Sequence, residues 1–254
     1  MPFESRFGQA ADAYSAYRPE YSPEIFERIL AAIPPGQRRV ALDLGAGTGK
    51  ATRVLIEHFA EVIAVEPDAL MVEQLRAYAP GAAVHAVKAE EFEQADASVD
   101  LVNIATALHW MDVPRVMWHV TRWLRPSGIL AVYGSEFPRT PEPVKAIIRE
   151  EFAQHWDQFR DERLRRKEFP QSIVRAAPGL QLFEESTIHH EVPMTPLEFA
   201  GFCRSTSYGS AYGRTLAGDE EAYWRDLEMR FRNAWREEKI PVDSRFYLIL
   251  ARKK

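Results

Sequence analysis

The chain of 254 residues has a single cysteine, no long apolar run and no excess of positive charge. Cys203 has no partner for an internal disulfide, which is typical of proteins from a reducing compartment. No apolar stretch approaches the roughly 20 residues that a membrane-spanning helix needs. The net charge of −5 argues against nucleic acid as the main partner, since nucleic-acid-binding proteins usually present a basic face. These absences favour a small-molecule substrate, with neither nucleic acid nor membrane as partner.

Further features are missing along the chain. Residues 1–10 lack the basic start and apolar stretch of a secretory signal, so we expect a cytoplasmic protein. His189-His190 has no helical ligand spacing and no other Cys or His nearby, so we expect no metal site. There is no internal repeat and no low-complexity segment. The length fits one α/β domain with an insertion or a small lid.

The most informative feature that is present is the run VALDLGAGTGK at residues 40–50. Val40 to Leu44 is typical of a buried strand, and the residues from Ala51 to Phe59 have the apolar spacing of a helix. Between them lie three alternating glycines at positions 45, 47 and 49. Glycine tolerates positive φ and lets a ligand approach the backbone closely, so this turn is expected to bind a nucleotide-like ligand.

Two known glycine loops fit this stretch only in part. The dinucleotide pattern G-x-G-x-x-G/A requires a small residue at position 50, where Lys50 stands. A phosphate-binding P-loop requires a glycine at position 44 and a hydroxyl at 51, where Leu44 and Ala51 stand. What remains is the pattern D-x-G-x-G-x-G after a strand. This pattern resembles the first motif of the class I S-adenosylmethionine-dependent methyltransferases.

Strands and helices alternate through the first half of the chain. Strands are expected at 40–44, 62–65, 83–87, 100–105 and 129–133, with helices between them. This alternation is typical of an α/β fold whose parallel sheet is covered by helices on both faces. Residues 136–178 interrupt it with a helical pattern. A sixth strand is expected within 180–192, a short helix at 196–205, a further helix through Tyr223, and a last strand at 246–251.

Ligands of an open parallel sheet bind beyond the carboxyl ends of its strands. The residues at these ends are Asp43 with the glycines, Glu66, Ala89-Glu90, and the stretch from Thr106 to Trp110. A carboxylate after the second strand suits both hydroxyls of a ribose, because it accepts two hydrogen bonds. This feature alone does not distinguish S-adenosylmethionine from NAD.

The resemblance extends to further motifs. Residues 14–21 (YSAYRPEY) together with 107–112 (ALHWMD) are similar to the methyltransferase type 11 group that includes trans-aconitate methyltransferases. The likeness spans about residues 3–134. It implies contacts with S-adenosylmethionine from Tyr14, Arg18, Asp43, Gly45, Ala46, Gly47, Glu66, Pro67, Met71, Ala89, Glu90 and Thr106.

The resemblance also implies an architecture. We expect a Rossmann-like doubly wound sheet of seven strands, mostly parallel with an antiparallel C-terminal strand, plus a helical insertion or lid. The expected divisions are an N-terminal cap and helix (1–36), a cofactor-binding core (37–135), a helical insertion (136–179), and the C-terminal part of the sheet with substrate-lid helices (180–254).

The expected reaction is methyl transfer to a small molecule, with a carboxylate oxygen as one acceptor. His109 is the best-placed base for a phenol, amine or carbon acid, whereas an ionised carboxylate needs none and His109 would instead orient it. Trp110, Arg204 and Tyr208 are expected to contact the substrate, and the segment 202–208 to help close the pocket.

Other interpretations stay open at this stage. His109 and Trp110 can also be interpreted as structural residues. The tyrosines of the N-terminal segment can likewise be interpreted as residues that pack at the sheet edge. A nicotinamide-dependent oxidoreductase and a non-catalytic S-adenosylmethionine-binding protein are alternative functions. A base-amino methyltransferase lacks support, because Asn103-Ile-Ala-Thr106 stands where its Asn/Asp-Pro-Pro-aromatic motif is expected.

Overall fold

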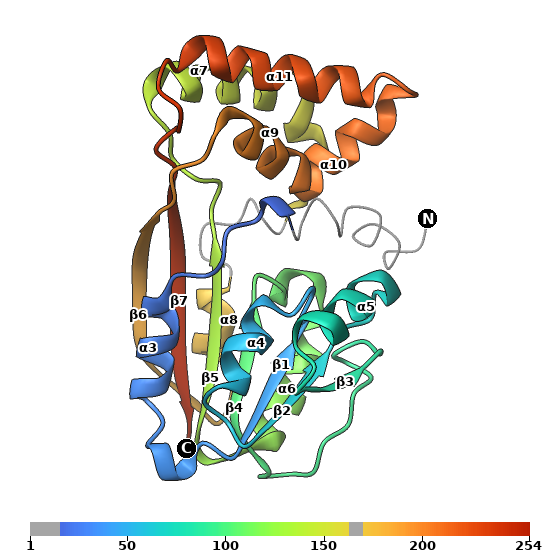
Figure 1. Ribbon diagram of the computed structural model, residues 1–254. Helices are drawn as coiled ribbons and strands as arrows, with labels where there is room; N and C mark the ends of the chain where they lie inside the picture. Colours follow the sequence, from blue (N-terminus) through green and yellow to red (C-terminus); the bar gives the residue numbers. More distant parts are fainter. Residues whose placement is uncertain (1–15, 163–169) are drawn as a thin grey trace. The chain divides into compact units, whose positions relative to one another are not determined.

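The computed structural model describes residues 16–162 and 170–254 (Figure 1). Within them the chain forms two compact units, each with a hydrophobic core of its own. The first unit takes residues 16–19, 136–162 and 189–245, and the second takes 20–135, 170–188 and 246–254. In these described stretches, every helix is too short or too polar to cross a lipid bilayer.

The second unit contains the parallel part of the sheet. Its strands are β1 (Val40–Leu44), β2 (Glu61–Val65), β3 (Ala83–His85), β4 (Val99–Ala105) and β5 (Leu124–Ser135). Its helices are α3 (Pro23–Ala31), α4 (Lys50–Ile56), α5 (Ala69–Tyr78), α6 (Val113–Trp123) and α8 (Gln171–Ala176), with 3-10 turns η1 (Pro35–Gln37) and η2 (Leu108–Trp110). Two long strands, β6 (Leu180–Glu191) and β7 (Asp243–Lys253), complete the sheet.

The seven strands follow the order β3-β2-β1-β4-β5-β7-β6. The first five pair in parallel, and β7 runs antiparallel to β5. The predicted fold, a seven-stranded and mostly parallel sheet with an antiparallel C-terminal strand, is therefore confirmed. The chain moves outward from β1 to β3 and then crosses to β4, so the strand order reverses between β1 and β4, where open α/β sheets bind their ligands.

Alternate side chains of the central strands enter two different cores. Leu42 and Val102 pack with the apolar residues of α6 and α8, whereas Ala41 and Leu101 pack with those of α3 and α4. Successive residues of a strand point to opposite faces of the sheet, so helices cover both faces (Figure 1). This burial on both sides explains why the parallel strands are apolar along nearly their whole length.

Polar residues fix where two of these helices begin. The carboxylate of Asp68 accepts hydrogen bonds from the backbone N–H groups of Leu70 (3.0 Å) and Met71 (3.1 Å) at the start of α5. Asp112 accepts from Arg115 N at the start of α6 (3.4 Å). These bonds satisfy N–H groups that have no partner within the helix. The α5 cap also sets the position of the chain directly after β2.

Strand β5 differs from its expected start at residue 129. It begins at Leu124, which pairs with Val99, and the register then shifts so that Ile129 pairs with Leu101. The turn residues 126–128 are accommodated between these two pairs, with Ser127 at a φ of 67°. A turn-forming sequence therefore lies within the strand as an irregularity rather than before it.

The first unit is helical. It contains α7 (Glu142–Glu151), the π-helical turn η3 (Phe152–Trp156), the 3-10 turns η4 (Asp157–Phe159) and η6 (Arg214–Leu216), and the helices α9 (Pro196–Ser205), α10 (Ser207–Gly213) and α11 (Glu220–Ala234). Aromatic side chains dominate its core, including Trp156, Phe199 and Phe231, each with no exposed surface. At the start of α9, Thr195 and Glu198 form a reciprocal capping box.

Candidate functional site

The glycine loop lies at the carboxyl edge of the parallel strands and is held there by β2. The N–H groups of Gly45 and Ala46 both donate to the carbonyl of Val65, at 2.8 and 3.1 Å. Glu66 N in turn donates to the carbonyl of His85, at 3.1 Å. The ends of β1, β2 and β3 are thereby joined through backbone bonds, and the predicted site residues of β1 and β2 lie together.

All three glycines of the loop adopt positive φ, namely 69° at Gly45, 57° at Gly47 and 90° at Gly49. A Cβ on Gly45 would lie 2.5 Å from the Cβ of Ala107, so that glycine is required by packing against the chain after β4. Among the residues that the structure describes, a Cβ on Gly47 would have no heavy atom within 4 Å. The space beside Gly47 is therefore open to a ligand, whereas the neighbouring glycine serves the fold.

Glu66 joins this open loop to the end of β2. Its Oε2 accepts from Gly47 N at 2.9 Å and its Oε1 accepts from Asp68 N at 3.0 Å. The residue is 8% exposed. Burial raises the pKa of its carboxyl, while the two backbone hydrogen bonds act in the opposite direction. The result is a buried carboxylate, fixed in position beside the open face of Gly47.

Asp43 occupies a different environment, although it is only two residues from the loop. It is fully buried, and its two carboxylate oxygens accept from Thr52 Oγ1 (2.6 Å) and Asn103 Nδ2 (2.8 Å). Burial raises the pKa of Asp43, and both hydrogen bonds oppose this shift. Asp43 therefore ties β1 to α4 and β4 beneath the loop, and its contact with a cofactor stays a prediction.

Thr106 follows β4 in a strained backbone conformation. Its φ is 56°, which is unusual for a β-branched residue. Its N–H donates to the carbonyl of Tyr133 at 2.7 Å, and its hydroxyl lies 3.5 Å from Tyr21 Oη. Strain of this kind is concentrated at functional sites, which agrees with the prediction that Thr106 belongs to the binding site. Tyr21 packs edge-on against Tyr133 and Phe246, as in the packing alternative for the N-terminal tyrosines.

His109 and Trp110 lie on η2, directly after the segment that packs on Gly45. His109 is 7% exposed, and its ring centroid lies 4.5 Å from that of Trp110. Of the remaining predicted cofactor residues, Met71 and Ala89 are buried, and Pro67 and Glu90 are partly exposed. These placements do not test the predicted roles, which stay predictions.

Three further predicted residues lie in the first unit, and Tyr14 lies outside the described residues. Arg18 donates to Ser205 Oγ at 2.9 Å, and its guanidinium lies 4.7 Å from the centre of the Phe202 ring. Arg204 forms ion pairs with Glu220 (3.2 Å) and Glu221 (2.6 Å).

Tyr208 is 8% exposed and lies within the aromatic core of the first unit. Burial raises the pKa of its hydroxyl well above the ordinary tyrosine value, so this group stays protonated at neutral pH. Its predicted contact with substrate, like that of Arg204, stays a prediction.

Sequence reasoning did not identify several partners of the predicted residues. Thr52 and Asn103 orient Asp43, and Glu20 accepts from Lys50 Nζ at 2.7 Å. Lys50 is the residue that conflicts with the dinucleotide pattern, and through Glu20 it bonds the segment before α3. A threonine in the first turn of α4 was the available signal for Thr52. Asn103 and Glu20 become neighbours only through the fold.

The sequence of this sheet core also has known counterparts. Residues 42–132 match the methyltransferase domain family. The match begins within β1 and ends within β5, so it includes the loop, Glu66, Thr106 and His109. It covers less than half of the chain, and the methyltransferase domain family therefore accounts for the parallel core only.

Relatives with curated sequences support the same assignment. A stretch of 126 residues is 45% identical to an uncharacterized methyltransferase from Mycobacterium tuberculosis and covers 50% of each chain. An alignment over 153 residues is 31% identical to a Saccharomyces cerevisiae protein provisionally named an S-adenosylmethionine-dependent methyltransferase, and it covers 54% of this chain and 50% of that relative. The chain thus spans about half the length of the curated relatives it matches.

Solved structures extend the likeness to the rest of the chain. A protein from Anaeromyxobacter dehalogenans, provisionally assigned as a type II methyltransferase, superposes with a TM-score of 0.73 and 23% identity. The superposition covers 94% of this chain and 98% of that one. At this identity the likeness shows the fold alone, and it agrees with the Rossmann-like sheet described above.

Proposed function

We propose that this protein binds S-adenosylmethionine at the glycine loop and transfers its methyl group to a small molecule. The observation that carries the proposal is the placement of Glu66, which is buried, bonded to Gly47 N and adjacent to the open side of the loop. The methyltransferase domain match covers the same residues, and one matched relative is named as dependent on S-adenosylmethionine.

The residues of the loop fit such a cofactor. Each oxygen of a carboxylate accepts more than one hydrogen bond, so Glu66 has capacity for ribose hydroxyls beyond its bonds to Gly47 N and Asp68 N. Gly47 presents no side chain on the open side, which allows close approach of the ligand to the backbone. When bound, S-adenosylmethionine supplies a methyl group already activated by the positive charge of its sulfonium. The chain must then mainly align the acceptor, and alignment contributes as much as ~7–11 kcal/mol to lowering a barrier.

For the acceptor we propose a small carboxylic acid, in keeping with the similarity to the trans-aconitate methyltransferase group. A carboxylate is ionised at neutral pH, so its methylation requires no base. His109 then orients the acceptor, and Trp110 beside it is predicted to contact the acceptor. For a phenol or an amine, His109 would instead accept the proton.

The nicotinamide alternative is disfavoured by Lys50. The dinucleotide pattern needs a small residue there for close packing of helix on strand. In this protein α4 begins at Lys50, and its ammonium group donates to Glu20. A measurement of turnover distinguishes an enzyme from a protein that only binds S-adenosylmethionine.

Calorimetry with S-adenosylmethionine tests the cofactor. Glu66→Ala removes two hydrogen bonds to a charged acceptor, so we expect a loss of ~2–4 kcal/mol, or about thirtyfold to a thousandfold in affinity. Glu61→Ala is the matched control, because Glu61 is the exposed first residue of the same strand, at the end opposite the loop. Equal affinity of wild type and Glu66→Ala would refute the proposed site.

Mass spectrometry of S-adenosylhomocysteine release then tests catalysis on a panel of small carboxylic acids, phenols and amines. We expect turnover with a carboxylic acid, and His109→Asn should lower turnover while S-adenosylmethionine affinity is retained. His58→Asn is the control, since His58 is exposed after α4. Tight cofactor binding without turnover on any acceptor would favour the non-catalytic alternative.

A further inference from the structure

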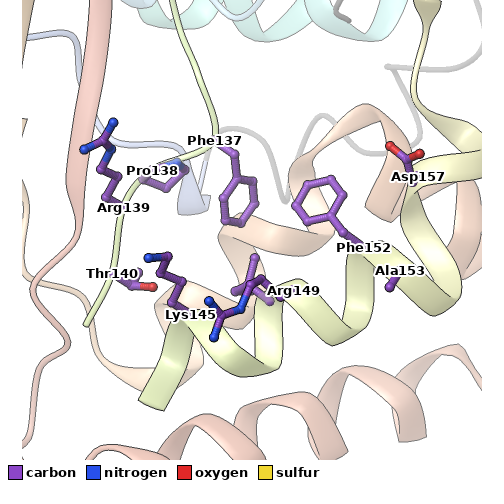
Figure 2. Close-up of a pocket in the computed structure, with 10 residues that line it drawn as sticks. Phe137, Pro138, Arg139, Thr140, Lys145, Arg149, Phe152, Ala153 and Asp157 are labelled. Carbon is purple, nitrogen blue, oxygen red and sulfur yellow. The ribbon is translucent and has the colours of Figure 1, made fainter. Parts of the chain in front are cut away.

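A cavity of about 440 Å³ lies within the first unit, and none of the roles described above uses it (Figure 2). Its walls come from the segment that links β5 to α7 and from the stretch that runs from α7 through η3 to η4. Sites for small ligands are typically ~300–1,000 Å³, so the cavity has room for a compact organic molecule.

The middle of the cavity is lined by apolar side chains that pack against one another. Phe137 and Phe152 meet edge to face with ring centroids 5.4 Å apart, and Ile148 beside them is 6% exposed. Phe137 is held from behind by Phe199 and Phe202, whose ring centroids lie 6.4 and 5.8 Å away. Aromatic side chains fixed in this way bind an apolar group with little further loss of conformational freedom.

Phe152 and Ala153 enter the wall from a π-helical turn. Helix α7 ends at Glu151, and the next five residues, Phe152–Trp156, form this turn. Turns of this kind are rare and occur frequently at functional sites. Their position at the cavity is a second and independent indication that the cavity has a role in binding.

One side of the cavity carries three cationic side chains, Arg139, Lys145 and Arg149 (Figure 2). Lys145 and Arg149 share a single carboxylate, that of Glu142, at 2.9 and 3.0 Å. The pKa of Glu142 is lowered, first by the hydrogen bond from Lys145 and also by the charge of Arg149. The positive charges of Lys145 and Arg149 are therefore only partly balanced by the single negative charge of Glu142.

Arg139 adds a third positive charge. Its backbone is fixed by two hydrogen bonds with Asp243, each 2.9 Å long. The carboxylate of Asp243 already contacts Arg245 Nε and His189 Nδ1, both at 3.3 Å. In the part of the chain that the structure describes, the guanidinium of Arg139 forms no ion pair. An exposed arginine whose backbone is anchored at the edge of an apolar cavity suits a carboxylate, which a guanidinium binds through two parallel hydrogen bonds.

We propose that this cavity binds a small carboxylate with an aromatic body, its ring against Phe137 and Phe152 and its carboxylate toward Arg139, Lys145 and Arg149. Asp157 lines the cavity on the side away from these cations (Figure 2). The proposal concerns the first unit alone and is independent of the proposed methyl transfer.

The test uses the full chain and three probes, 3-phenylpropionate, its neutral isostere 3-phenylpropanamide, and acetate. Nuclear magnetic resonance titration measures the affinity of each. We expect 3-phenylpropionate to bind about tenfold more tightly than the amide, a difference of ~1.4 kcal/mol, and acetate to bind more weakly than either. Added salt should weaken binding of the carboxylate and leave that of the amide unchanged, because screening acts on charge pairs near the surface.

Arg139→Gln should weaken 3-phenylpropionate about threefold to fivefold, as for a partly exposed ion pair, without changing the affinity of the amide. Arg232→Gln is the matched control, because this exposed arginine of α11 pairs with Glu228 within its own helix. If Arg139→Gln fails to fold, Lys145→Gln tests the same wall of the cavity. Phe152→Leu should weaken both aromatic probes.

Equal affinity of the carboxylate and the amide in the wild type, or no saturable binding of either, would overturn the proposal. So would an unchanged affinity for 3-phenylpropionate in Arg139→Gln. The variant Glu66→Ala should bind 3-phenylpropionate as the wild type does, so failure of the cavity and failure of the cofactor site are distinguished by separate measurements.

Discussion

Glu66 holds the loop through bonds within the protein, because its carboxylate accepts hydrogen bonds from Gly47 N and Asp68 N. The carbonyl of Val65 holds Gly45 and Ala46 from the same strand end. These bonds hold the loop in its backbone conformation with positive φ angles. A preorganised site loses less conformational entropy on binding, which favours affinity.

The titration of Glu66 gives a prediction at the residue scale. Its pKa is raised in the folded protein, so the protonated form is favoured there relative to the unfolded chain, and lowering the pH through the folded pKa removes the buried charge and its cost to folding. Cofactor binding has the opposite dependence, because the ribose hydroxyls need an ionised acceptor. We expect S-adenosylmethionine affinity, measured by calorimetry, to fall as the pH is lowered, starting above the ordinary glutamate value of 4.5.

Glu66→Gln provides the comparison for this prediction. The amide keeps the shape of the side chain but does not titrate, so its weaker binding should lose the part of the pH dependence that Glu66 contributes. An identical pH profile in wild type and variant would assign the dependence to another group, such as Asp43, whose pKa is also raised.

At the level of single residues, the sequence predicted the glycine loop. It did not predict the residues that hold Asp43 beneath the loop. Alternating glycines after a strand indicate close ligand approach by their chemistry alone, and Gly47 has the open side that this requires. One partner of Asp43 is Asn103, 60 positions along the chain, and no local pattern indicates such a contact. The sequence likewise did not indicate that Asp43 is fully buried.

At the scale of elements, the start of α5 determines how the chain leaves β2 beside the loop. Asp68→Ala removes the bonds from its carboxylate to Leu70 N and Met71 N. Loss of such a cap typically costs about 1 kcal/mol, with a range of ~0.5–2 kcal/mol. We expect a decrease of that size in the free energy of unfolding, measured by urea denaturation.

Asp96→Ala is the matched control for this cap. Asp96 is an exposed aspartate that pairs with Arg122, and an exposed pair contributes only ~0–1 kcal/mol. The bond to Glu66 Oε1 is donated by the backbone N–H of residue 68 and therefore remains in Asp68→Ala. A variant as stable as the wild type would show that neighbouring contacts, not the cap, fix the start of α5.

Elements were predicted best where local chemistry and burial agree. The helix at 196–205 has the expected bounds, because Thr195, Pro196 and Glu198 are all favourable at a helix start. Helix α10 was not predicted, since its sequence SYGSAYG contains two glycines and has a low intrinsic helix propensity. It is stabilised by tertiary packing, in which Tyr208 joins the aromatic core of the first unit.

At the scale of the whole molecule, the strand-end residues of the proposed cofactor site belong to one unit, whereas Arg18, which is also predicted to contact the cofactor, belongs to the other. The loop, Glu66, Thr106 and His109 lie in the second unit, with the three-layered sheet core. The matched family covers the same part of the chain. The aromatic core of the first unit contains none of these residues.

This division predicts where ligand binding stabilises the chain. A ligand that binds only the folded state stabilises it by about 2.7 kcal/mol when present at 100 times its Kd. Hydrogen exchange with saturating S-adenosylmethionine should therefore slow, and slow most strongly at residues 43–49 and 62–71, where Glu66 and the glycines are. Peptides of α11 serve as the internal reference for a general increase in stability. Slowing no greater at the loop than at α11, or equal slowing in wild type and Glu66→Ala, would contradict a cofactor site built on these strand ends.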